Sequence, residues 1–167
     1  MIIHQFVAML EPGAVGSHTL VARDVLRAAG HTSEIYTDLV HEGCVNEGAR
    51  PLAEYRGDAD VMVYQLAIGS PAADVVLEHT EALVLNYHTF TPPALLELWD
   101  HNAANGAAWG LAQLAELAPR AAMGIAVSEH NRAELDASGC ARTTVVPILL
   151  REEPSHSAHE MPSETTW

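Results

Sequence analysis

The sequence predicts an α/β domain built on a parallel sheet with helices on both faces. Short apolar runs alternate with helical patterns from one end of the chain to the other, which is typical of β-α-β units. At 167 residues with 49% hydrophobic content, the chain can bury one core and is too short for two ordinary domains. We therefore expect one domain over residues 1–150.

Six segments have the length and composition of strands, each bounded by turn or polar residues. They are 2–7, 32–36, 60–64, 82–86, 123–127 and 143–146. Helical patterns predict helices at 17–29, 71–78, 93–99, 105–118 and 129–138. Ser128 is the expected N-cap of the last helix, and Gly139 is its expected stop.

The first helix should pack its apolar side chains on the sheet and turn its charged ones to solvent. The side chains expected on the sheet are Val21, Ala22, Val25, Leu26 and Ala29, and those expected in solvent are Arg23, Asp24 and Arg27. Residues 41–55 contain glycine and proline without a clear period and are predicted to form a loop. Residues 151–167 are polar and punctuated by proline, so we expect a disordered tail.

Charge composition excludes several mechanisms. The formal net charge is -14, and all eight basic residues are arginines, because the sequence contains no lysine. A Walker P-loop and a Schiff-base enzyme both need a lysine, so neither chemistry is expected. A strongly acidic surface also repels phosphate backbones, so nucleic acid is not an expected partner.

Targeting, metal and cofactor signals are weak. The longest apolar runs fall short of the roughly 20 residues that span a bilayer, so we expect no membrane span. The N-terminus has no basic region of the kind that opens a secretory signal, and a cytoplasmic location is expected. Cys44 and Cys140 are unpatterned and fit reduced thiols. His156 and His159 lack a third ligand, and we expect neither a metal site nor a cofactor.

The strongest local feature joins the first strand to the first helix through Glu11-Pro-Gly-Ala-Val-Gly-Ser17. Glycines let the backbone approach a ligand, and a helix N-terminus offers free N–H groups and a partial positive charge. Gly13, Gly16 and Ser17 are therefore candidate binding residues. A tight turn that needs its glycines only for backbone reasons explains the same pattern equally well.

A second feature, Asn86-Tyr-His-Thr-Phe-Thr-Pro92, follows the fourth predicted strand. It therefore lies at the carboxyl edge of the sheet, where open α/β folds bind ligands. Tyr87 and His88 are candidates, and His88 could donate to a sugar hydroxyl or stabilise developing charge. The alternative is an imidazole bonded within its own loop. We expect His88 to bury little, so that its replacement by alanine is nearly neutral for stability.

Two further strand ends should reach the same edge. Gln65, Gly69 and Ser70 lie where the third predicted strand leads into a helix, and Ser128 and Glu129 follow the fifth in the same way. All are candidate binding residues, although a plain helix cap explains both serines. No G-x-S-x-G elbow and no C-x-x-C pair occurs, which leaves hydrolase and redox templates without support.

In order and spacing, these motifs resemble the N-terminal domain of family-4 glycosyltransferases of the GT-B type, many of them bacterial. The resemblance covers about nine tenths of the chain. Thr89 stands where the family usually has asparagine. The matching segments are 1–31, Val63-Tyr-Gln-Leu-Ala-Ile-Gly-Ser70, Val84-Leu-Asn-Tyr-His-Thr-Phe-Thr-Pro92, Ile125-Ala-Val-Ser-Glu-His-Asn-Arg-Ala-Glu-Leu135 and Val145-Val-Pro-Ile-Leu-Leu150.

The resemblance implies a Rossmann-like domain that is one half of a retaining, nucleotide-sugar-dependent hexosyltransferase. It places Gly13, Gly16 and Ser17 near the donor phosphates and His88, the candidate catalytic residue, on the transferred sugar. The family's second domain binds the nucleotide sugar, and the sequence after Leu150 does not resemble it. We therefore expect a truncated enzyme, inactive alone, or one completed by a separate donor-binding chain.

Two other functions remain open. An NAD(P)-dependent oxidoreductase is suggested by the strand-loop-helix start and by Asp38 near the end of the second strand. The first loop reads G-x-x-G, however, and lacks the third glycine of the dinucleotide fingerprint, so we expect no NAD binding. A stand-alone binding module that has kept the fold and lost the chemistry is the third possibility.

Overall fold

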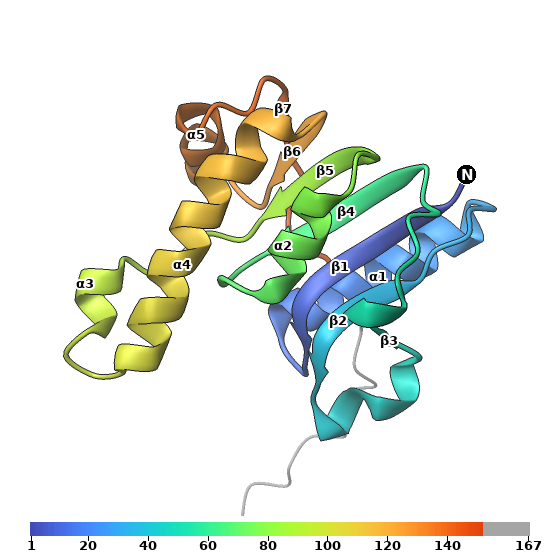
Figure 1. Ribbon diagram of the computed structural model, residues 1–167, viewed down its shortest axis with the longest axis horizontal. Helices are drawn as coiled ribbons and strands as arrows, with labels where there is room; N and C mark the ends of the chain where they lie inside the picture. The colour runs from blue at the N-terminus through green and yellow to red at the C-terminus, as the bar shows by residue number, and fades with distance from the viewer. Residues whose placement is uncertain (152–167) are drawn as a thin grey trace, which may run out of the picture.

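Seven strands pair in parallel to form the central sheet (Figure 1). The computed structural model describes residues 1–151. The disorder expected for the tail beyond Arg151 and the histidines His156 and His159 lie outside the described residues. The sheet order is β3-β2-β1-β4-β5-β6-β7, which confirms the predicted α/β class. The strands are β1 (Ile3–Leu10), β2 (Ile35–Val40), β3 (Arg50–Pro51), β4 (Val61–Leu66), β5 (Ala82–Tyr87), β6 (Met123–Ala126) and β7 (Thr143–Val145).

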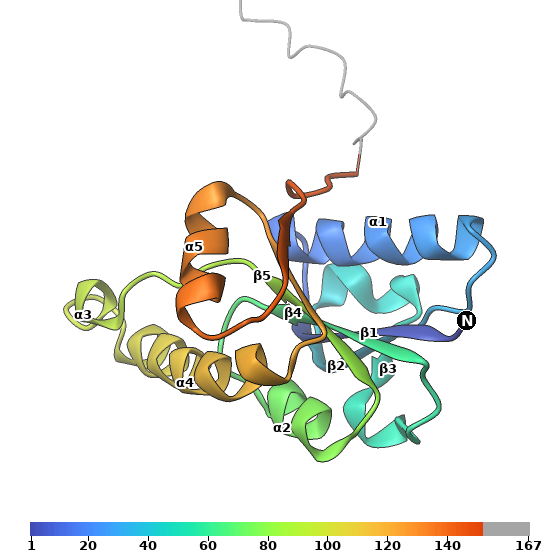
Figure 2. The ribbon, with the colours of Figure 1, turned by 90° about the horizontal axis from the view of Figure 1, so that it is seen from above.

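Helices cover both faces of this sheet (Figure 2). On one face lie α1 (Ala14–Ala28) and α5 (Glu129–Ala137), and on the other lie α2 (Pro71–Glu78) and α4 (His101–Leu117). The short α3 (Pro93–Leu96) packs on α4 and projects with it beyond the sheet (Figure 1). The connections from β1 to β2, β4 to β5, β5 to β6 and β6 to β7 therefore each cross a face through a helix, as β-α-β units require.

The two faces of the sheet differ in their packing. Beneath α2 and α4 lies a large apolar cluster that includes Phe6, Tyr64 and Leu85. Beneath α1 the apolar cluster is small and centres on Val7 and Ile35. Polar side chains from the central strands share that face, and these side chains form the candidate site described below.

The packing face of α1 differs from the predicted one. The expectation is wrong for Val25, which is 57% exposed, and for Arg23, which is only 6% exposed, whereas Asp24 and Arg27 are exposed as expected. Burial of Arg23 is possible because its guanidinium donates to the Glu47 carbonyl oxygen and lies 3.6 Å from the Glu47 carboxylate. A buried charge that is paired and hydrogen-bonded avoids most of the desolvation penalty that an isolated charge would incur.

The segment that pairs with Arg23 was predicted to be a loop, and it contains regular structure. Residues 41–55 form the 3-10 helices η1 (Glu42–Glu47) and η2 (Leu52–Glu54), with the edge strand β3 between them. Pro51 is tolerated in β3 because an edge strand leaves one side of its backbone unpaired. No periodic signal marks this segment because 3-10 turns this short are too brief to show one.

Other boundaries shift by a few residues, and the predicted caps are confirmed. α1 begins at Ala14, before the expected Ser17, and α4 begins at His101, where the Asp100 side chain caps it. The Ser128 hydroxyl accepts from the Asn131 N–H at the start of α5. Gly139 follows the same helix with a φ of 90°, a backbone conformation that favours glycine.

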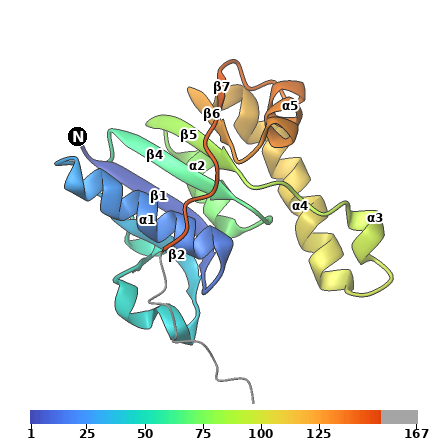
Figure 3. The same cartoon turned by 180° about the vertical axis from the view of Figure 1, so that it is seen from behind.

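After β7 the chain turns back across the sheet to α1 (Figure 3). We call residues 146–151 the C-terminal segment. The Val146 N–H donates to the Ala126 carbonyl at 2.9 Å, the Leu149 N–H donates to His18 Nδ1 at 2.9 Å, and the Arg151 N–H donates to the Ser17 hydroxyl at 2.7 Å. The first bond holds the segment on β6, and the other two fasten it to the first half of α1.

Candidate functional site

The strand order reverses between β1 and β4, which makes the carboxyl ends of these two strands the expected ligand crevice. The connection from β2 runs outward to β3 on one side, and β4 to β7 extend on the other. The candidate residues after β1, β4 and β5 therefore meet at one edge. Some of them contribute to two adjoining parts of the site, a buried polar network and an open pocket.

The buried network starts from polar side chains on the face of the sheet beneath α1. Gln5 of β1 donates from Nε2 to the Thr19 carbonyl of α1 at 2.9 Å, and its Oε1 accepts from Gln65 Nε2 at 3.0 Å. Gln65 Oε1 in turn accepts from Asn86 Nδ2 at 2.9 Å. All three side chains are almost fully buried. Such polar residues inside strands are retained only when they are hydrogen-bonded.

Two histidines complete the network. His88 Nε2 lies 2.8 Å from Gln65 Oε1, and His18 Nε2 lies 2.7 Å from Asn86 Nδ2. The two imidazole rings meet edge to face, with their centroids 5.4 Å apart. Both histidines are buried. Although 70 residues separate them in the sequence, they share one site beside the start of α1.

The backbone fixes which atoms donate in this network. The Thr19 carbonyl can only accept, so Gln5 Nε2 must face it, and Gln65 Nε2 must then face Gln5 Oε1. Gln65 Oε1 is therefore an acceptor, and His88 donates to it from Nε2–H. A neutral His88 then carries its lone pair on Nδ1, and that buried atom has no partner in the described part of the chain.

Burial sets the charge of His88. Desolvation, with a smaller contribution from His18, lowers the pKa of His88 from 6.5 to about 4. Desolvation also lowers the pKa of His18. His88 is therefore neutral near pH 7, and its free Nδ1 is suited to accept a hydrogen bond. The expected shallow position of His88 is wrong, because the side chain is only 9% exposed and bonds into the strand network.

The pKa of His88 predicts a pH-dependent stability. The unfolded histidine takes up a proton more readily than the folded one, so stability is complete above pH 6.5 and falls as the pH drops towards 4. Between pH 7 and 4.5 we expect His88 to contribute a loss of roughly 2–3 kcal/mol in the free energy of unfolding. His18 and His4, whose pKa values are also lowered by burial, add to it in the same direction.

Urea unfolding at several pH values measures this effect. The His88→Gln variant keeps a side chain that can donate to Gln65 and removes the titration, so its stability should fall less over the same pH range. The exposed His130 provides the control, because His130→Gln should behave as the wild type does. Parallel pH profiles for the wild type and His88→Gln would contradict the assignment.

Thr89 follows His88 with a strained backbone. Its φ is 68°, the left-handed region that a β-branched residue rarely occupies. The Thr89 hydroxyl donates to the Glu134 carboxylate of α5 at 3.1 Å, which helps to hold this conformation. Asparagine, the residue usual in the resembling family, tolerates this region better. Strain of this kind is found most often at functional sites.

The backbone geometry of the loop from β1 to α1 explains why it contains glycines. A Cβ on Gly16 would overlap the Glu11 carbonyl oxygen, so glycine is required there by the close approach of the backbone. Gly13 precedes the helix with a φ of 150° and provides no side-chain cap. The first turn of this 15-residue helix therefore presents N–H groups that no side chain caps. The tight-turn interpretation and the anion-site interpretation both fit this geometry.

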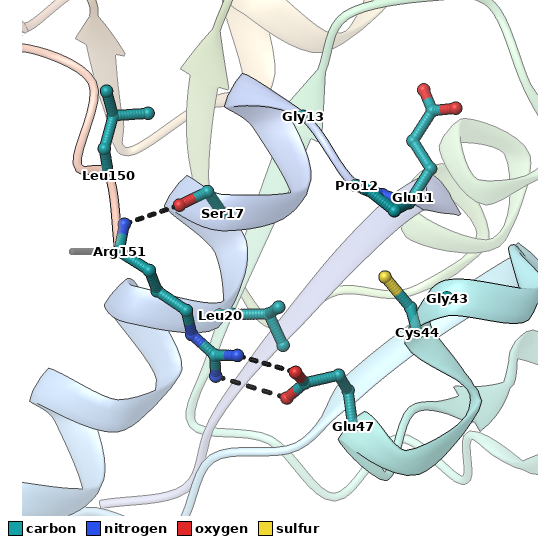
Figure 4. A pocket seen from close by; sticks show the side chains of 10 residues that line it. All are labelled: Glu11, Pro12, Gly13, Ser17, Leu20, Gly43, Cys44, Glu47, Leu150 and Arg151. Carbon is teal, nitrogen blue, oxygen red and sulfur yellow. Dashed lines mark hydrogen bonds and ion pairs between the residues drawn. The ribbon is translucent and has the colours of Figure 1, made fainter. Parts of the chain in front are cut away.

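Beside this turn lies an open pocket of about 560 Å³ (Figure 4). Arg151 spans it, with guanidinium nitrogens 2.6 and 3.2 Å from the Glu47 carboxylate oxygens and 3.2 Å from Asp24. Its positive charge is thus neutralised within the protein, and Glu11 adds a further carboxylate. The lining residues are Glu11, Pro12, Gly13, Ser17, Leu20, Gly43, Cys44, Glu47, Leu150 and Arg151.

Several other predicted site residues have structural roles. The Ser70 hydroxyl caps α2 and is buried, and Gln113 of α4 bonds to both the N–H and the carbonyl of Ser70. Gly69 packs so closely on α4 that a Cβ would lie 2.6 Å from the Gly110 nitrogen. Tyr87 is buried in the core beside Phe90.

The predicted pair at the start of α5 lies outside the polar network. Ser128 caps that helix, and Glu129 forms an exposed ion pair with Arg132 at 2.8 Å. Neither side chain bonds to Gln65 or His88 in the described residues. Of the ten predicted residues, the network contains His88 and Gln65, and the pocket wall contains Gly13 and Ser17.

Sequence reasoning missed Gln5, His18, Thr19 and Leu149 as members of the network, and it named Asn86 only as the start of a motif. A usable signal existed for Gln5, which is a polar residue that follows His4 inside an otherwise apolar strand. His18 follows Ser17 directly, but helical periodicity alone does not indicate which face of α1 meets the sheet. Leu149 contributes only its backbone N–H, which no sequence pattern reveals.

Residues 1–151 contain neither a cluster of metal ligands nor a membrane-spanning helix. No three histidine, cysteine or acidic side chains gather there in a way that could hold a metal ion. No helix in that range has the length and hydrophobicity needed to cross a bilayer.

The fold and site define a single Rossmann-like α/β domain that resembles one half of a GT-B fold. Among solved structures, an alpha-glucosyltransferase (AGT) in complex with UDP matches with a TM-score of 0.54 and 16% sequence identity. The match covers 83% of this chain and 38% of that enzyme's chain. No protein-family model and no curated protein matches the sequence.

Proposed function

We propose that this chain is the N-terminal half of a retaining, nucleotide-sugar-dependent glycosyltransferase, in which His88 contacts the sugar being transferred. The observation that carries the proposal is the free, buried Nδ1 of His88 at the carboxyl edge of the sheet. A buried acceptor without a partner costs about 1–3 kcal/mol, so it favours a ligand that donates a hydrogen bond. Sugar hydroxyl groups are such donors.

Glycosyl transfer builds positive charge at the anomeric carbon and negative charge on the departing diphosphate. The uncapped first turn of α1 provides N–H groups and the positive end of a helix dipole for the phosphates. His88 is neutral and orients the sugar by accepting a hydrogen bond from a sugar hydroxyl group. The sequence instead predicts that His88 donates to such a group. The protein's contribution is positioning and electrostatic stabilisation, with no nucleophile required.

The proposed reaction needs a donor-binding half, carried on the same polypeptide or on a separate chain. The matched glucosyltransferase was solved with UDP, and the present domain corresponds to a minor share of its length. We propose that the pocket beside α1 takes part of the acceptor, since its carboxylates suit hydroxyl groups better than phosphates. A cytoplasmic location, where nucleotide sugars are made, fits the same proposal.

Saturation-transfer NMR with UDP-glucose tests the proposal on the chain alone. We expect transfer to the glucose protons and little to the uridine protons, because the nucleotide would bind the other half. His88→Gln should abolish the glucose signal, whereas His130→Gln, on an 81% exposed side chain, should keep it. NAD should give no signal. Equal signals from uridine and glucose, or micromolar NAD binding, would overturn the proposal in favour of a nucleotide-binding domain.

A further inference from the structure

His18 faces two hydrogen-bond donors and can satisfy only one of them at a time. The Leu149 N–H points at Nδ1 from 2.9 Å, and the Asn86 amide nitrogen lies 2.7 Å from Nε2. A neutral imidazole has one protonated nitrogen and one lone pair, and a protonated imidazole has no lone pair. The two contacts therefore compete.

Reorienting the amides does not remove this conflict. Turning Asn86 over would place its oxygen against Gln65 Oε1, and turning Gln65 as well would place its oxygen against Gln5 Oε1. Turning Gln5 in response would set its oxygen against the Thr19 carbonyl. One unfavourable contact remains wherever the chain of amides is reversed, because both of its ends are backbone groups whose roles are fixed.

We infer that His18 couples the C-terminal segment to His88. When His18 accepts from Asn86, the amides keep the orientation that makes His88 an Nε2–H donor with a free Nδ1, and the Leu149 N–H loses its acceptor. When His18 accepts from Leu149, its Nε2–H faces Asn86 and favours the reversed orientation, in which His88 accepts at Nε2 and carries its proton on Nδ1.

The two arrangements differ in where the unfavourable contact lies. Asn86 is 1% exposed and has no access to water, whereas the bond from Leu149 to His18 is only partly buried. A released Leu149 N–H can be hydrated, which costs less than leaving a buried amide unpaired. The C-terminal segment is therefore held by the hydrogen bond from Leu149 to His18, and the competing bond from Asn86 to His18 weakens it.

The coupling gives His18 a positioning role in the proposed function. A ligand hydroxyl that donates to His88 Nδ1 stabilises the Nε2–H form, and through Gln65 and Asn86 it favours release of Leu149 from His18. Occupancy of the site would thus be transmitted to the segment that leads out of the domain after β7. This last step rests on the proposed function, but the competition at His18 exists without any ligand.

Nitrogen-15 NMR of the histidine rings in the ligand-free chain tests the competition directly. In the wild type we expect His18 to populate both tautomers. Leu149→Pro removes the outer donor and should move His18 to the Nδ1–H form, with His88 entirely Nε2–H. Leu150→Pro also replaces a leucine of the segment but removes an N–H with no hydrogen bond in the described residues, so it should leave both rings as in the wild type.

Removing the inner donor should have the opposite effect. In Asn86→Leu, His18 should become Nε2–H, and the Leu149 amide should exchange with solvent at least about tenfold more slowly, as expected for an uncontested hydrogen bond. A single His18 tautomer in the wild type and both variants, or unchanged Leu149 exchange in Asn86→Leu, would overturn the coupling. If Asn86→Leu fails to fold, the comparison of Leu149→Pro with Leu150→Pro still decides. None of these results depends on sugar binding.

Discussion

Replacing Gly110 by alanine should destabilise the domain by about 3 kcal/mol, the upper end of the usual cost of overpacking. A Cβ at this position would lie 2.5 and 2.6 Å from two ring carbons of Phe90 and 2.8 Å from the Gly69 nitrogen. The ring is buried and the nitrogen belongs to the backbone, so neither can move away at low cost. Urea unfolding of the variant and the wild type measures the difference.

Gly106 provides the matched control, one turn earlier in α4. Its added Cβ would meet only the end of the Ile68 side chain, at 2.9 and 3.1 Å, and that side chain is 41% exposed and free to turn aside. Alanine also gains up to about 1 kcal/mol over glycine in a helix interior. Gly106→Ala should therefore be neutral or slightly stabilising. Equal losses in the two variants would show that helix α4 does not pack on the 69–70 turn and Phe90 in this way.

This packing also positions the candidate site. Phe90 lies two residues after His88, and Gly69 lies in the turn after β4, so a shift of α4 moves the loops on both sides of Gln65. The sequence suggested Gly69 as a ligand contact because it precedes a helix. Its close approach to α4 is a sufficient reason for glycine there, and that approach is a tertiary contact that local sequence does not reveal.

Six of the seven strands were predictable because they carry strong local signals, and the short edge strand β3 was not. β4 and β5 are mostly apolar segments bounded by polar residues, each interrupted by one buried polar side chain, Gln65 or Asn86. The packing face of α1 was not predictable in this way. Arg23 is buried because Glu47, more than 20 residues away, supplies partners for its guanidinium, and a rule that places charged residues outside puts Arg23 on the wrong side.

The candidate site was predictable in position but not in chemistry. The carboxyl edge follows from parallel topology, which placed His88, Gln65 and Gly13 correctly at that edge. The protonation state of His88 depends on burial and on a chain of amides from Gln5 to Asn86 that ends at the Thr19 carbonyl. These contacts join three strands and a helix, so they become visible only in the folded structure.

Gln65→Leu should be among the most destabilising substitutions of the sheet, with an expected loss of about 3–5 kcal/mol. It removes the partner of Gln5 Oε1, of one Asn86 amide proton and of His88 Nε2–H, all of which are buried. The glucose signal of the NMR experiment should disappear as well, because His88 would no longer be held in one orientation.

A double-mutant cycle with Gln5→Leu separates loss of the network from a misfit of the leucine side chain. Gln5→Leu alone leaves Gln65 Nε2 and the Thr19 carbonyl without their shared partner. The double variant replaces both members of the Gln5–Gln65 bond by apolar groups of similar size, which is far less costly than leaving one member unpaired. We expect the double variant to be more stable than additive losses predict, by at least about 1 kcal/mol. Urea unfolding of the four proteins measures the cycle, and strictly additive losses, or a Gln65→Leu loss below about 1 kcal/mol, would show that Gln65 is not the centre of a connected network.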